Sequence, residues 1–572
     1  MTNKIYTVIT FAPVQGFIEK SRKLRDLYGS SYLLSYISWV ICNAAENRGC
    51  TVISPASINV TQGMPNQIII EGNFPEDEAK SVLLKAWKCI TETCREWIET
   101  NVEVIEGEKV DYTPWKRTWG LWTKYAWEFF WVRGEENQTI SDVRKKLNEK
   151  KRARDWTGIN WQGESSTLSG ADAIAYPKLG FNSDPRKYNY QQEKNDVRAF
   201  YQALREKLGE SLIDPKEELS VPELIKRMIT YETVSNQLIK NFRTEFGKNG
   251  ANIDPLIEEI QQISNDLQPS SFKDLNRHKD NTKVTQEQQK RGFQGWFQGD
   301  GDKAGDYLKK YPHKTHEFSE EMRDWGKWFK NKPLHFGRVI YAGGDDFLGV
   351  FYDREDEGDK LEPKYCVDWF KDFKSKIWHQ NKTTKEEQKK ITVSVGFVWA
   401  FRGIPQRDIL QHCREAEKSA KNNGRDRIAF RILFNNGNYL EWVCPWWLLA
   451  EGLLSGYQDR DKNEAKVKQN WTHIYNDVAV LESRHAFDDD GLDVALGLFE
   501  IYFPDYLETI KDNQKRLHPQ KANLTEVRSG ILGEEDMYYQ ENTQVIDQTK
   551  VNKALTNWII NFAKVGFHLC QQ

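Results

Sequence analysis

The chain has 572 residues, of which 81 are basic, 84 are acidic and 13% are aromatic, and its net charge is −3. This length is too great for one core and predicts several domains, while so many aromatic residues exclude a disordered chain. The even charge balance argues against wholesale coating of nucleic acid, although not against local basic tracks. The eight cysteines include no CxxC pair, which argues against a zinc ribbon or a disulfide framework. With no signal-peptide pattern and no apolar run of the ~20 residues that span a bilayer, we expect a cytoplasmic protein without a membrane partner.

The first part of the chain alternates strand and helix patterns. Runs rich in β-branched residues predict strands, and apolar residues at helical spacing predict the helices between them. The predicted elements are a strand at 5–11, a helix at 14–45, strands at 50–54 and 67–72, a helix at 75–99 and a strand at 127–133. This β-α-β-β-α-β order is the ferredoxin-like arrangement.

The strand patterns fade between about residues 140 and 285. The basic run RKKLNEKKRARDW (144–156) is suited to RNA phosphates, although a charge run is more often a solvated face. Helical patterns follow at 195–208, 221–242 and 255–267, and the run 277–291, which has almost no apolar residues, predicts a linker. This part of the chain is therefore expected to be a helical domain.

A second α/β unit begins at residue 292. The predicted elements are a strand, an acidic turn and a helix within 292–311, two strands joined by a glycine turn within 335–353, a helix at 366–379, a strand at 391–401, a helix at 406–424 and a strand at 427–434. Apart from the last helix and strand, the order repeats that of the first unit, which suggests an old duplication. After residue 440 the patterns are mostly helical. An apolar stripe of Leu492, Leu496, Phe499 and Phe503 predicts a bundle that buries one face and offers another to a helical neighbour.

Two acidic clusters mark this second unit. Asp300, Gly301 and Asp302 end its first strand, and Asp345 and Asp346 lie on the hairpin between its second and third strands. In a ferredoxin-like sheet the first and third strands are central neighbours, so both clusters are expected at one edge. Each cluster taken alone is also typical of a polar turn or a helix cap.

Carboxylates that converge in this way repel one another and raise some of their pKa values, and a divalent metal removes that cost. A set of oxygen ligands suits Mg²⁺ or Mn²⁺. Two such ions about 4 Å apart can align a hydroxyl with the α-phosphate of a nucleotide. Gly343 and Gly344 let the turn tighten and bring a triphosphate close to backbone N–H groups. The acids therefore predict a metal-dependent nucleotide site.

Five stretches, spread over most of the chain, carry a resemblance to a known family. They are TFAPVQGFIEKSRKLRDLYGSSYLLS (10–35), EELSVPELIKRM (217–228), DGDKAG (300–305), YAGGDDFLGVF (341–351), and SVGFVWA with EAEKSAKNNGRDRIAF (394–400 and 415–430). In this order they resemble the large (Cas-ten, Cmr-type) subunit of type III CRISPR effector complexes. The palm domains of that family are related to nucleotide cyclases and nucleic-acid polymerases.

The resemblance implies roles for individual residues. It makes Asp300, Asp345 and Asp346 the catalytic metal ligands, assisted by the Gly301 carbonyl. The nucleotide-binding residues that it implies are Gly301, Asp302, Gly343, Gly344, Lys421, Ser30 and Ser31. Lys421 lies in the AK element that contacts triphosphate in related cyclases, although a solvated helix position would suit it too. A serine after a glycine is more often a turn or cap residue.

The chain also departs from the family that it resembles. Many members begin with an HD nuclease domain, whereas this sequence begins at the first palm strand and none of its ten histidines is followed by Asp. The zinc-binding cysteines of the family are replaced by a segment that contains GINWQGESSTLSG (158–170), and Ala304 stands where a methionine is usual. We therefore expect no HD nuclease.

We expect an α+β protein with two ferredoxin-like palm domains (1–185 and 289–438), a helical domain (186–288) and a C-terminal helical bundle (439–572). By resemblance, it works with crRNA, target RNA and other Cas subunits, including the small helical subunit. Pairing with target RNA would activate the second palm to make cyclic oligoadenylate from ATP with Mg²⁺ or Mn²⁺. One alternative is adenylyl transfer to another acceptor such as S-adenosylmethionine. Another is a catalytically silent subunit that organises RNA, although the intact DGD and GGDD count against it.

Overall fold

The computed structural model describes residues 4–21, 24–55, 67–136, 138–153, 159–161, 163–179, 186, 189–209, 212–246, 292–353, 360–379, 391–401, 403–460, 470–488, 491–541 and 543–570. The predicted helix at 255–267 and the predicted linker at 277–291 lie outside these residues. The chain divides into two compact units, one of residues 1–279 and 311–323 and the other of residues 280–310 and 324–572. The expected α+β fold class is confirmed, while the division into four domains stays a prediction.

The first unit contains a mixture of strands and longer helices. Its elements are β1 (Tyr6–Ala12), α1 (Val14–Glu19), α2 (Leu24–Asn47), β2 (Thr51–Ser54), β3 (Gln67–Glu71), α3 (Glu76–Asn101), β4 (Val104–Ile105), β5 (Glu108–Lys109), α4 (Thr113–Tyr125), β6 (Glu128–Arg133), α5 (Ile140–Arg152), α6 (Tyr190–Leu208), α7 (Val221–Met228) and α8 (Glu232–Phe246). The four predicted strands are β1, β2, β3 and β6, and their ends agree within one residue.

These four strands form a sheet with the order β2-β3-β1-β6, in which every neighbouring pair is antiparallel. Val8 of the central strand β1 lies opposite Ile69 of β3 and Val132 of β6. The first and third of the four strands are therefore neighbours at the centre, which is the ferredoxin-like order. The predicted topology of the first palm is confirmed.

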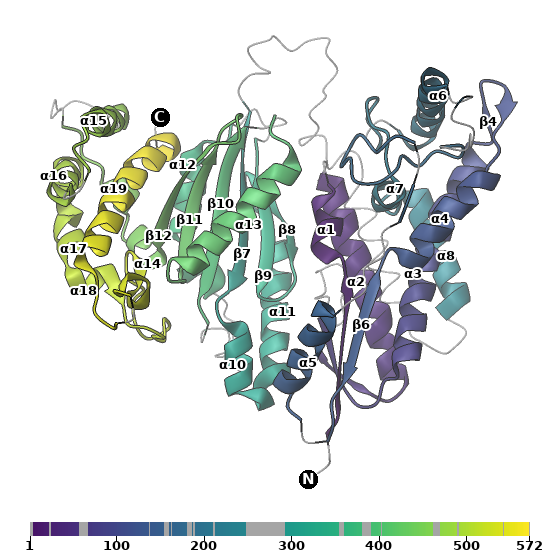
Figure 1. Cartoon of the computed structure of the whole chain (residues 1–572), viewed down its shortest axis with the longest axis horizontal. Coiled ribbons are helices and arrows are strands. Elements are labelled where there is room, and N and C mark those ends of the chain that lie inside the picture. Colours follow the sequence, from purple (N-terminus) through teal and green to yellow (C-terminus); the bar gives the residue numbers. More distant parts are fainter. Residues whose placement is uncertain are drawn as a thin grey trace. The chain divides into compact units, whose positions relative to one another are not determined.

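Helices cover both faces of this sheet. On one face, α2 and α3 enclose the main core, in which Ile9 and Ile37 are fully buried. On the other face, α5 buries Val143 and Leu147 against Val8 (Figure 1). Residues 144–152 of the basic run lie on α5, where the sequence patterns indicated no helix. The apolar spacing of Val143 and Leu147, four residues apart, is the signal that would have indicated one.

Two of the motif stretches pack against each other in the first unit. The Lys226 ammonium group of α7 donates to the Lys20 carbonyl, which follows α1, at 2.8 Å. Arg227 of α7 is fully buried and forms ion pairs with Asp26 of α2 and with Glu217. The two stretches therefore meet inside the protein, where Arg227 pairs with Asp26 and Glu217.

The second unit contains the longer sheet and the C-terminal helices. Its elements are β7 (Phe293–Gly301), α10 (Ala304–Lys310), β8 (Gly337–Ala342), β9 (Asp346–Phe351), α12 (Pro363–Lys371), β10 (Val393–Phe401), α13 (Gln406–Asn422), β11 (Arg427–Leu433), β12 (Tyr439–Pro445), α14 (Trp446–Ala450), α15 (Thr472–Ser483), α16 (Leu492–Tyr502), α17 (Leu507–Lys511), α18 (Asn513–Arg516), β13 (Leu517–His518), β14 (Gly533–Glu534) and α19 (Gln548–Cys570). Helix α11 (Thr315–Asn331) begins among the residues of the first unit and ends in the second.

The sheet of the second unit has the order β12-β11-β10-β7-β9-β8. Strands β7 to β10 repeat the ferredoxin-like order, with β7 between β9 and β10. Strand β11 adds parallel to β10 after the crossover helix α13, and β12 adds antiparallel to β11. The sequence analysis predicted no strand at β12. The pair Asn436-Gly437 before it is a hairpin signal that would have indicated this strand.

Strand β10 is buried on both faces, as its unbroken apolar sequence indicates. Phe397 packs on one face with Phe370 of α12 and Phe430 of β11. Gly396 lies on the opposite face against α13, which crosses β10 and β11 (Figure 1). Successive residues of β10 therefore point alternately to the aromatic core on one face of the sheet and to α13 on the other.

The predicted apolar stripe of the C-terminal bundle lies inside the protein. Phe499 and Phe503 are fully buried, and both contact Phe562 of α19. These residues hold the bundle together, so this face is not available to a neighbouring subunit. Val494 and Ile501 of α16, the helix that also contains Phe499, are 38% and 54% exposed.

The short strand β13 contains a buried histidine, His518. His518 is 3% exposed, and its Nδ1 accepts a hydrogen bond of 3.0 Å from the Gly530 N–H. Burial first, and the charge of Arg427 second, lower the pKa of His518 to about 4 from its ordinary value of 6.5. The folded protein therefore keeps His518 neutral at the pH of a cell.

We expect His518 to make the free energy of unfolding depend on pH. Its pKa is lower in the folded state, so its contribution is complete above about pH 6.5 and is lost on acidification, by roughly 2 kcal/mol at about pH 5. His518→Asn, whose side-chain oxygen can still accept from Gly530, should remove this part of the slope. Urea unfolding at about pH 7 and about pH 5 measures it. His485→Asn, at an exposed ion pair with Asp488, is the control, and equal slopes in both variants would contradict the prediction.

The eight cysteines are all described and all have free thiols. Six of them are buried, where a thiol packs as a small apolar side chain. Among the described helices, none is long and apolar enough to cross a membrane.

Candidate active site

The two predicted acidic clusters meet at one end of the second sheet. Asp300 of β7 lies directly opposite Asp346 of β9. The Gly301 N–H donates to the Asp345 carbonyl at 2.9 Å, which brings the hairpin beside the end of β7. The expectation that the first and third strands bring these acids together is confirmed, because β7 and β9 are neighbours in the sheet.

The hairpin between β8 and β9 turns on two glycines. Gly344 has a φ of 125°, a conformation that residues with a Cβ rarely adopt. The Gly343 N–H donates to the Asp346 carbonyl at 3.1 Å and closes the turn. This N–H is therefore used within the hairpin, and the binding of a nucleotide by Gly343 and Gly344 stays a prediction.

Helix α13 brings a cation to the acids. Lys421, in the last turn of α13, forms ion pairs with Asp300 and, at 2.6 Å, with Glu417. A cation is favourable at the C-terminal end of a helix, where the backbone dipoles place partial negative charge. The helix approaches β10 at Gly396, where an added Cβ would lie 2.3 Å from the Glu417 nitrogen. This close contact between sheet and helix sets the position of Lys421.

We expect Gly396→Ala to lower the free energy of unfolding by roughly 1–3 kcal/mol, the usual cost of overpacking a core. The new methyl group would also lie 2.4 Å from the Cys413 carbonyl oxygen, so α13 has to move away from β10. Thermal and denaturant unfolding of the full chain measure the effect. Gly497→Ala in α16 is the control, because an added Cβ there meets nothing within 4 Å. Equal stability of the two variants would contradict the close packing.

Burial and mutual repulsion shift the pKa values of the hairpin acids. Burial first, and the carboxylates of Asp300 and Asp346 second, raise the pKa of Asp345 to about 8 from 3.8. Burial and Asp300 raise the pKa of Asp346 to about 6, while a hydrogen bond of 2.5 Å from the Tyr341 hydroxyl opposes the shift. Burial also raises the pKa of Asp300, and the Lys421 ammonium acts against this. The site therefore holds more carboxylate than its own cation neutralises.

Glu417 is a further carboxylate at this end that the sequence analysis did not single out. Burial raises the pKa of Glu417, and the Lys421 ammonium opposes the shift. Although burial acts to lower it, the pKa of Lys421 is raised by the carboxylates of Asp300 and Glu417. The spacing of four residues between Glu417 and Lys421 on a predicted helix was the signal available in the sequence.

Asp302 differs from its neighbours in the DGD motif. It is 4% exposed, and its carboxylate bonds to the hydroxyl groups of Thr392 and Ser394 inside the protein. The resemblance implied that Asp302 binds a nucleotide. The structure instead turns this carboxylate towards β10.

The donor atoms at the acidic end are carboxylate oxygens. Asp300 and Glu417 pair with the Lys421 ammonium group, and Asp345 and Asp346 lie close enough to Asp300 for its carboxylate to raise their pKa values. Oxygen donors with excess negative charge fit a divalent cation such as Mg²⁺ or Mn²⁺. As they stand, no three His, Cys, Asp or Glu side chains in the described ranges form a group ready to hold a metal ion. The four predicted metal ligands therefore stay a prediction.

Ser30 and Ser31 lie on α2, in the first compact unit. Ser30 is fully buried, and its hydroxyl donates to the Asp26 carbonyl at 2.6 Å, a bond within the helix. Ser31 is partly exposed. The contact of these serines with a nucleotide stays a prediction.

Part of the basic run on α5 is neutralised within the chain. Lys146 pairs with Glu135, and Lys150 pairs with Glu76 at 3.1 Å. Exposed pairs of this kind contribute little to stability, but they reduce the net positive charge that the helix presents. The proposed contact with RNA phosphates stays a prediction.

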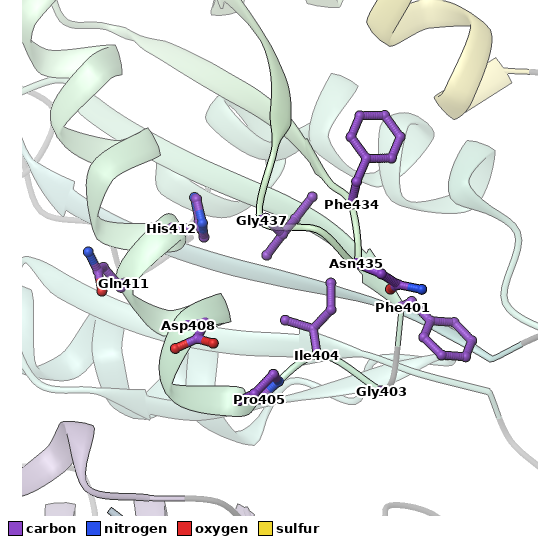
Figure 2. Close-up of a pocket in the computed structure, with 11 residues that line it drawn as sticks. Phe401, Gly403, Ile404, Pro405, Asp408, Gln411, His412, Phe434, Asn435 and Gly437 are labelled. Atoms are coloured by element: carbon purple, nitrogen blue, oxygen red, sulfur yellow. The ribbon is translucent and has the colours of Figure 1, made fainter.

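A cavity of about 430 Å³ lies at the other end of β10, where β10 and β11 end and α13 begins. Figure 2 shows Phe401, Ile404, Asp408, His412 and Phe434 among its lining residues. A nine-residue strand spans roughly 30 Å, so the length of β10 separates this cavity from the acids. The cavity is therefore not part of the acidic site.

Two family models match the sequence. The model for Cas10/Cmr2, second palm domain, matches residues 293–429, which include all the acids of the site and Lys421. The model for CRISPR-associated protein Cmr2, N-terminal, matches residues 6–64 in the first sheet's unit. These two stretches match domains of the Cas10/Cmr2 family. They support the resemblance inferred from the sequence motifs, and the acidic site lies in the stretch that matches the second palm.

Several solved structures are similar to this chain. The apo state of a type III-B Cmr-beta complex matches with 13% identity and a TM-score of 0.47, over 98% of this chain and 82% of that chain. A Csm1–Csm4 cassette in complex with cA4 matches with 13% identity and a TM-score of 0.42, over 99% and 70%. Csm1 of T. onnurineus matches with 13% identity and a TM-score of 0.43, over 100% and 70%. No curated protein sequence matches this chain.

Proposed function

We propose that this chain is the large subunit of a crRNA-guided type III CRISPR complex, and that its second palm makes a nucleotide second messenger from ATP. The observation that carries the proposal is the opposition of Asp300 and Asp346 across β7 and β9, with Lys421 at the end of α13. These groups lie within the stretch that matches the Cas10/Cmr2 second palm.

The reaction that suits this group of acids is nucleotidyl transfer. A ribose hydroxyl oxygen of one ATP attacks the α-phosphorus of another ATP. The new bond between oxygen and phosphorus forms while the bond from the α-phosphorus to the oxygen bridging to the β-phosphate breaks. Pyrophosphate leaves, and the hydroxyl group loses its proton. Catalysis of such a step depends chiefly on positioning and on charge stabilisation.

The residues of the chain divide these tasks. The carboxylates of Asp300, Asp345 and Asp346, with the Gly301 carbonyl, would hold Mg²⁺ or Mn²⁺, which supplies charge stabilisation at the phosphoryl oxygens and lowers the pKa of the attacking hydroxyl. We assign Lys421 to the triphosphate, because a flexible ammonium group at a helix end suits a charged and mobile partner. In the absence of a triphosphate, its ion pairs with Asp300 and Glu417 hold the Lys421 ammonium group at the acidic end.

Cyclic oligoadenylate is the product that we propose for this site. It requires that the acceptor hydroxyl belongs to another adenylate unit. Transfer of AMP to S-adenosylmethionine uses the same acids and the same leaving group, so the acceptor pocket decides between the two products. A silent subunit would need neither the acids nor the lysine, and their convergence counts against it.

The partners that we propose are crRNA, target RNA and other Cas subunits, including the small helical subunit, in the cytoplasm. The buried stripe of the C-terminal bundle is occupied within the chain, so another face of the bundle would meet a helical neighbour. The exposed residues Val494 and Ile501, seven positions apart on α16, lie on one such face.

The test uses the complex assembled around the full chain with crRNA. It is incubated with labelled ATP and Mg²⁺, with either a matching or a non-matching target RNA, and the products are identified by mass spectrometry. Cyclic oligoadenylate that forms only with the matching target would support the proposal. A conjugate of AMP with S-adenosylmethionine, in reactions that contain both, would replace the acceptor. A complex that binds target RNA and yields no product from ATP would instead support the alternative that the chain is a catalytically silent subunit that organises RNA.

A further inference from the structure

Asp302 is held by three donors from two distant parts of the chain. Its Oδ1 accepts from the Ser394 hydroxyl at 2.7 Å, and its Oδ2 accepts from the Thr392 hydroxyl at 2.8 Å. The Oδ2 atom also accepts from the Asp426 backbone N–H at 3.0 Å. The Asp302 N–H in turn donates to the Thr392 carbonyl at 2.8 Å. A carboxylate whose two oxygens are engaged in this way, in a residue that is 4% exposed, faces the interior of the protein.

The backbone on either side of this carboxylate is strained. Lys303, the residue after Asp302, has a φ of 56°. Arg425 and Asp426, in the loop between α13 and β11, have φ values of 62° and 52°. Residues other than glycine cost free energy in this region and persist only where their surroundings hold them. The bond between Asp302 and the Asp426 N–H is one such constraint, and the Lys374 ammonium group 2.6 Å from the Asp426 carboxylate is another.

The end of β7 and the C-terminal end of α13, which Asp302 connects, also form the acidic site. Strand β7 carries Asp300 and is followed directly by Asp302, and α13 carries Lys421 and is followed by the loop that contains Asp426. Asp300 pairs with Lys421, and Asp302 bonds to Asp426. The end of β7 and the end of α13 are therefore joined twice, once through a partly buried ion pair and once through a buried carboxylate.

We propose that Asp302 is a positioning residue, which fixes the end of α13 against the end of β7 and does not itself contact metal or nucleotide. This role rests on the proposed function of the acidic site, because the role of Asp302 is to keep Asp300 and Lys421 in their relative positions there. Loss of the Asp302 carboxylate frees the loop at residues 424–427 and displaces Lys421. A displacement of about 1 Å can reduce a rate by about 10²-fold.

The test compares Asp302→Asn, Asp302→Ala and Asp300→Asn in the full chain. The first readout is hydrogen exchange of the Asp426 amide without nucleotide, which we expect to be about tenfold or more faster in Asp302→Ala, since its acceptor is gone. Asp302→Asn keeps an acceptor oxygen and should exchange nearly as wild type does. The second readout is the affinity for a non-hydrolysable ATP analogue with Mg²⁺, measured by calorimetry. Asp302→Asn should retain most of this affinity, whereas Asp300→Asn should lose it.

Each result decides the assignment. An affinity lost in Asp302→Asn as fully as in Asp300→Asn, with exchange at Asp426 unchanged, would make Asp302 a ligand and overturn the proposal. If Asp302→Ala does not fold, the double variant Thr392→Val, Ser394→Ala, which removes two of the donors, should reproduce the faster exchange, and its failure to do so would also overturn it. Should the wild-type chain bind no nucleotide, the proposed function fails while the exchange experiment still tests Asp302.

Discussion

The double variant Asp345→Asn, Asp346→Asn is expected to make no detectable nucleotide product, a loss of about 10³-fold or more. Asparagine keeps the size of both side chains but removes two of the carboxylates that would hold the divalent ion. The charge stabilisation that such an ion supplies amounts to several kcal/mol of the barrier, which corresponds to this factor. The complex should still assemble and bind target RNA, because both residues are partly exposed at the hairpin. Mass spectrometry of the products and a filter-binding assay with target RNA measure the two quantities.

The matched control for this variant is Asp306→Asn in α10. The Asp306 side chain is 66% exposed and pairs with Lys309 in the same helix, so its loss should leave synthesis unchanged. Normal synthesis by the Asp345→Asn, Asp346→Asn variant would refute the metal assignment. If that variant no longer assembled, the hairpin acids would have a structural role instead.

The variant Arg227→Met is expected to lower the free energy of unfolding of the first unit by roughly 3–5 kcal/mol, the usual effect of breaking a buried ion pair. The Arg227 guanidinium group is fully buried and bonds to Asp26 at 2.6 Å and 3.2 Å, and to Glu217 at 2.5 Å and 3.2 Å. Without it, two buried carboxylates face each other with no guanidinium between them. Denaturant unfolding followed by tryptophan fluorescence, together with limited proteolysis, measures the loss.

The variant Arg48→Met provides the comparison for Arg227→Met. Arg48 pairs with Glu78, and the two side chains are 43% and 39% exposed, so this change should cost less than about 1 kcal/mol. A triple variant with Asp26→Leu, Glu217→Met and Arg227→Met should recover part of the stability, because the two acids that lose the guanidinium group are removed with it. An Arg227→Met variant as stable as Arg48→Met would show that water or other groups already neutralise the two acids.

The sequence by itself determined the ferredoxin-like order of four strands in each sheet and the meeting of the acids. Runs of β-branched residues, separated by helical spacing, indicate the strands and their order, and the ferredoxin-like order makes the first and third strands neighbours. Asp300 and Asp346 follow from that order alone, since each ends or begins one of these strands. The sequence patterns did not indicate β12, although a hairpin signal precedes it. They did not indicate α5 either, because this segment is mostly charged and only two of its positions are apolar and buried.

Only the tertiary structure decided what each polar side chain near the site does. Asp300 and Asp302 are two residues apart in one motif, yet one pairs with Lys421 and the other is buried against Thr392 and Ser394. Glu417 belongs to the site for the same reason as Lys421, because Gly396 lets α13 lie close to β10. The partners of Asp302 are about ninety or more residues away in the sequence. Local sequence indicates where a strand or a helix forms, but the partner of a side chain depends on register and on contacts between distant segments, which exist only after the chain has folded.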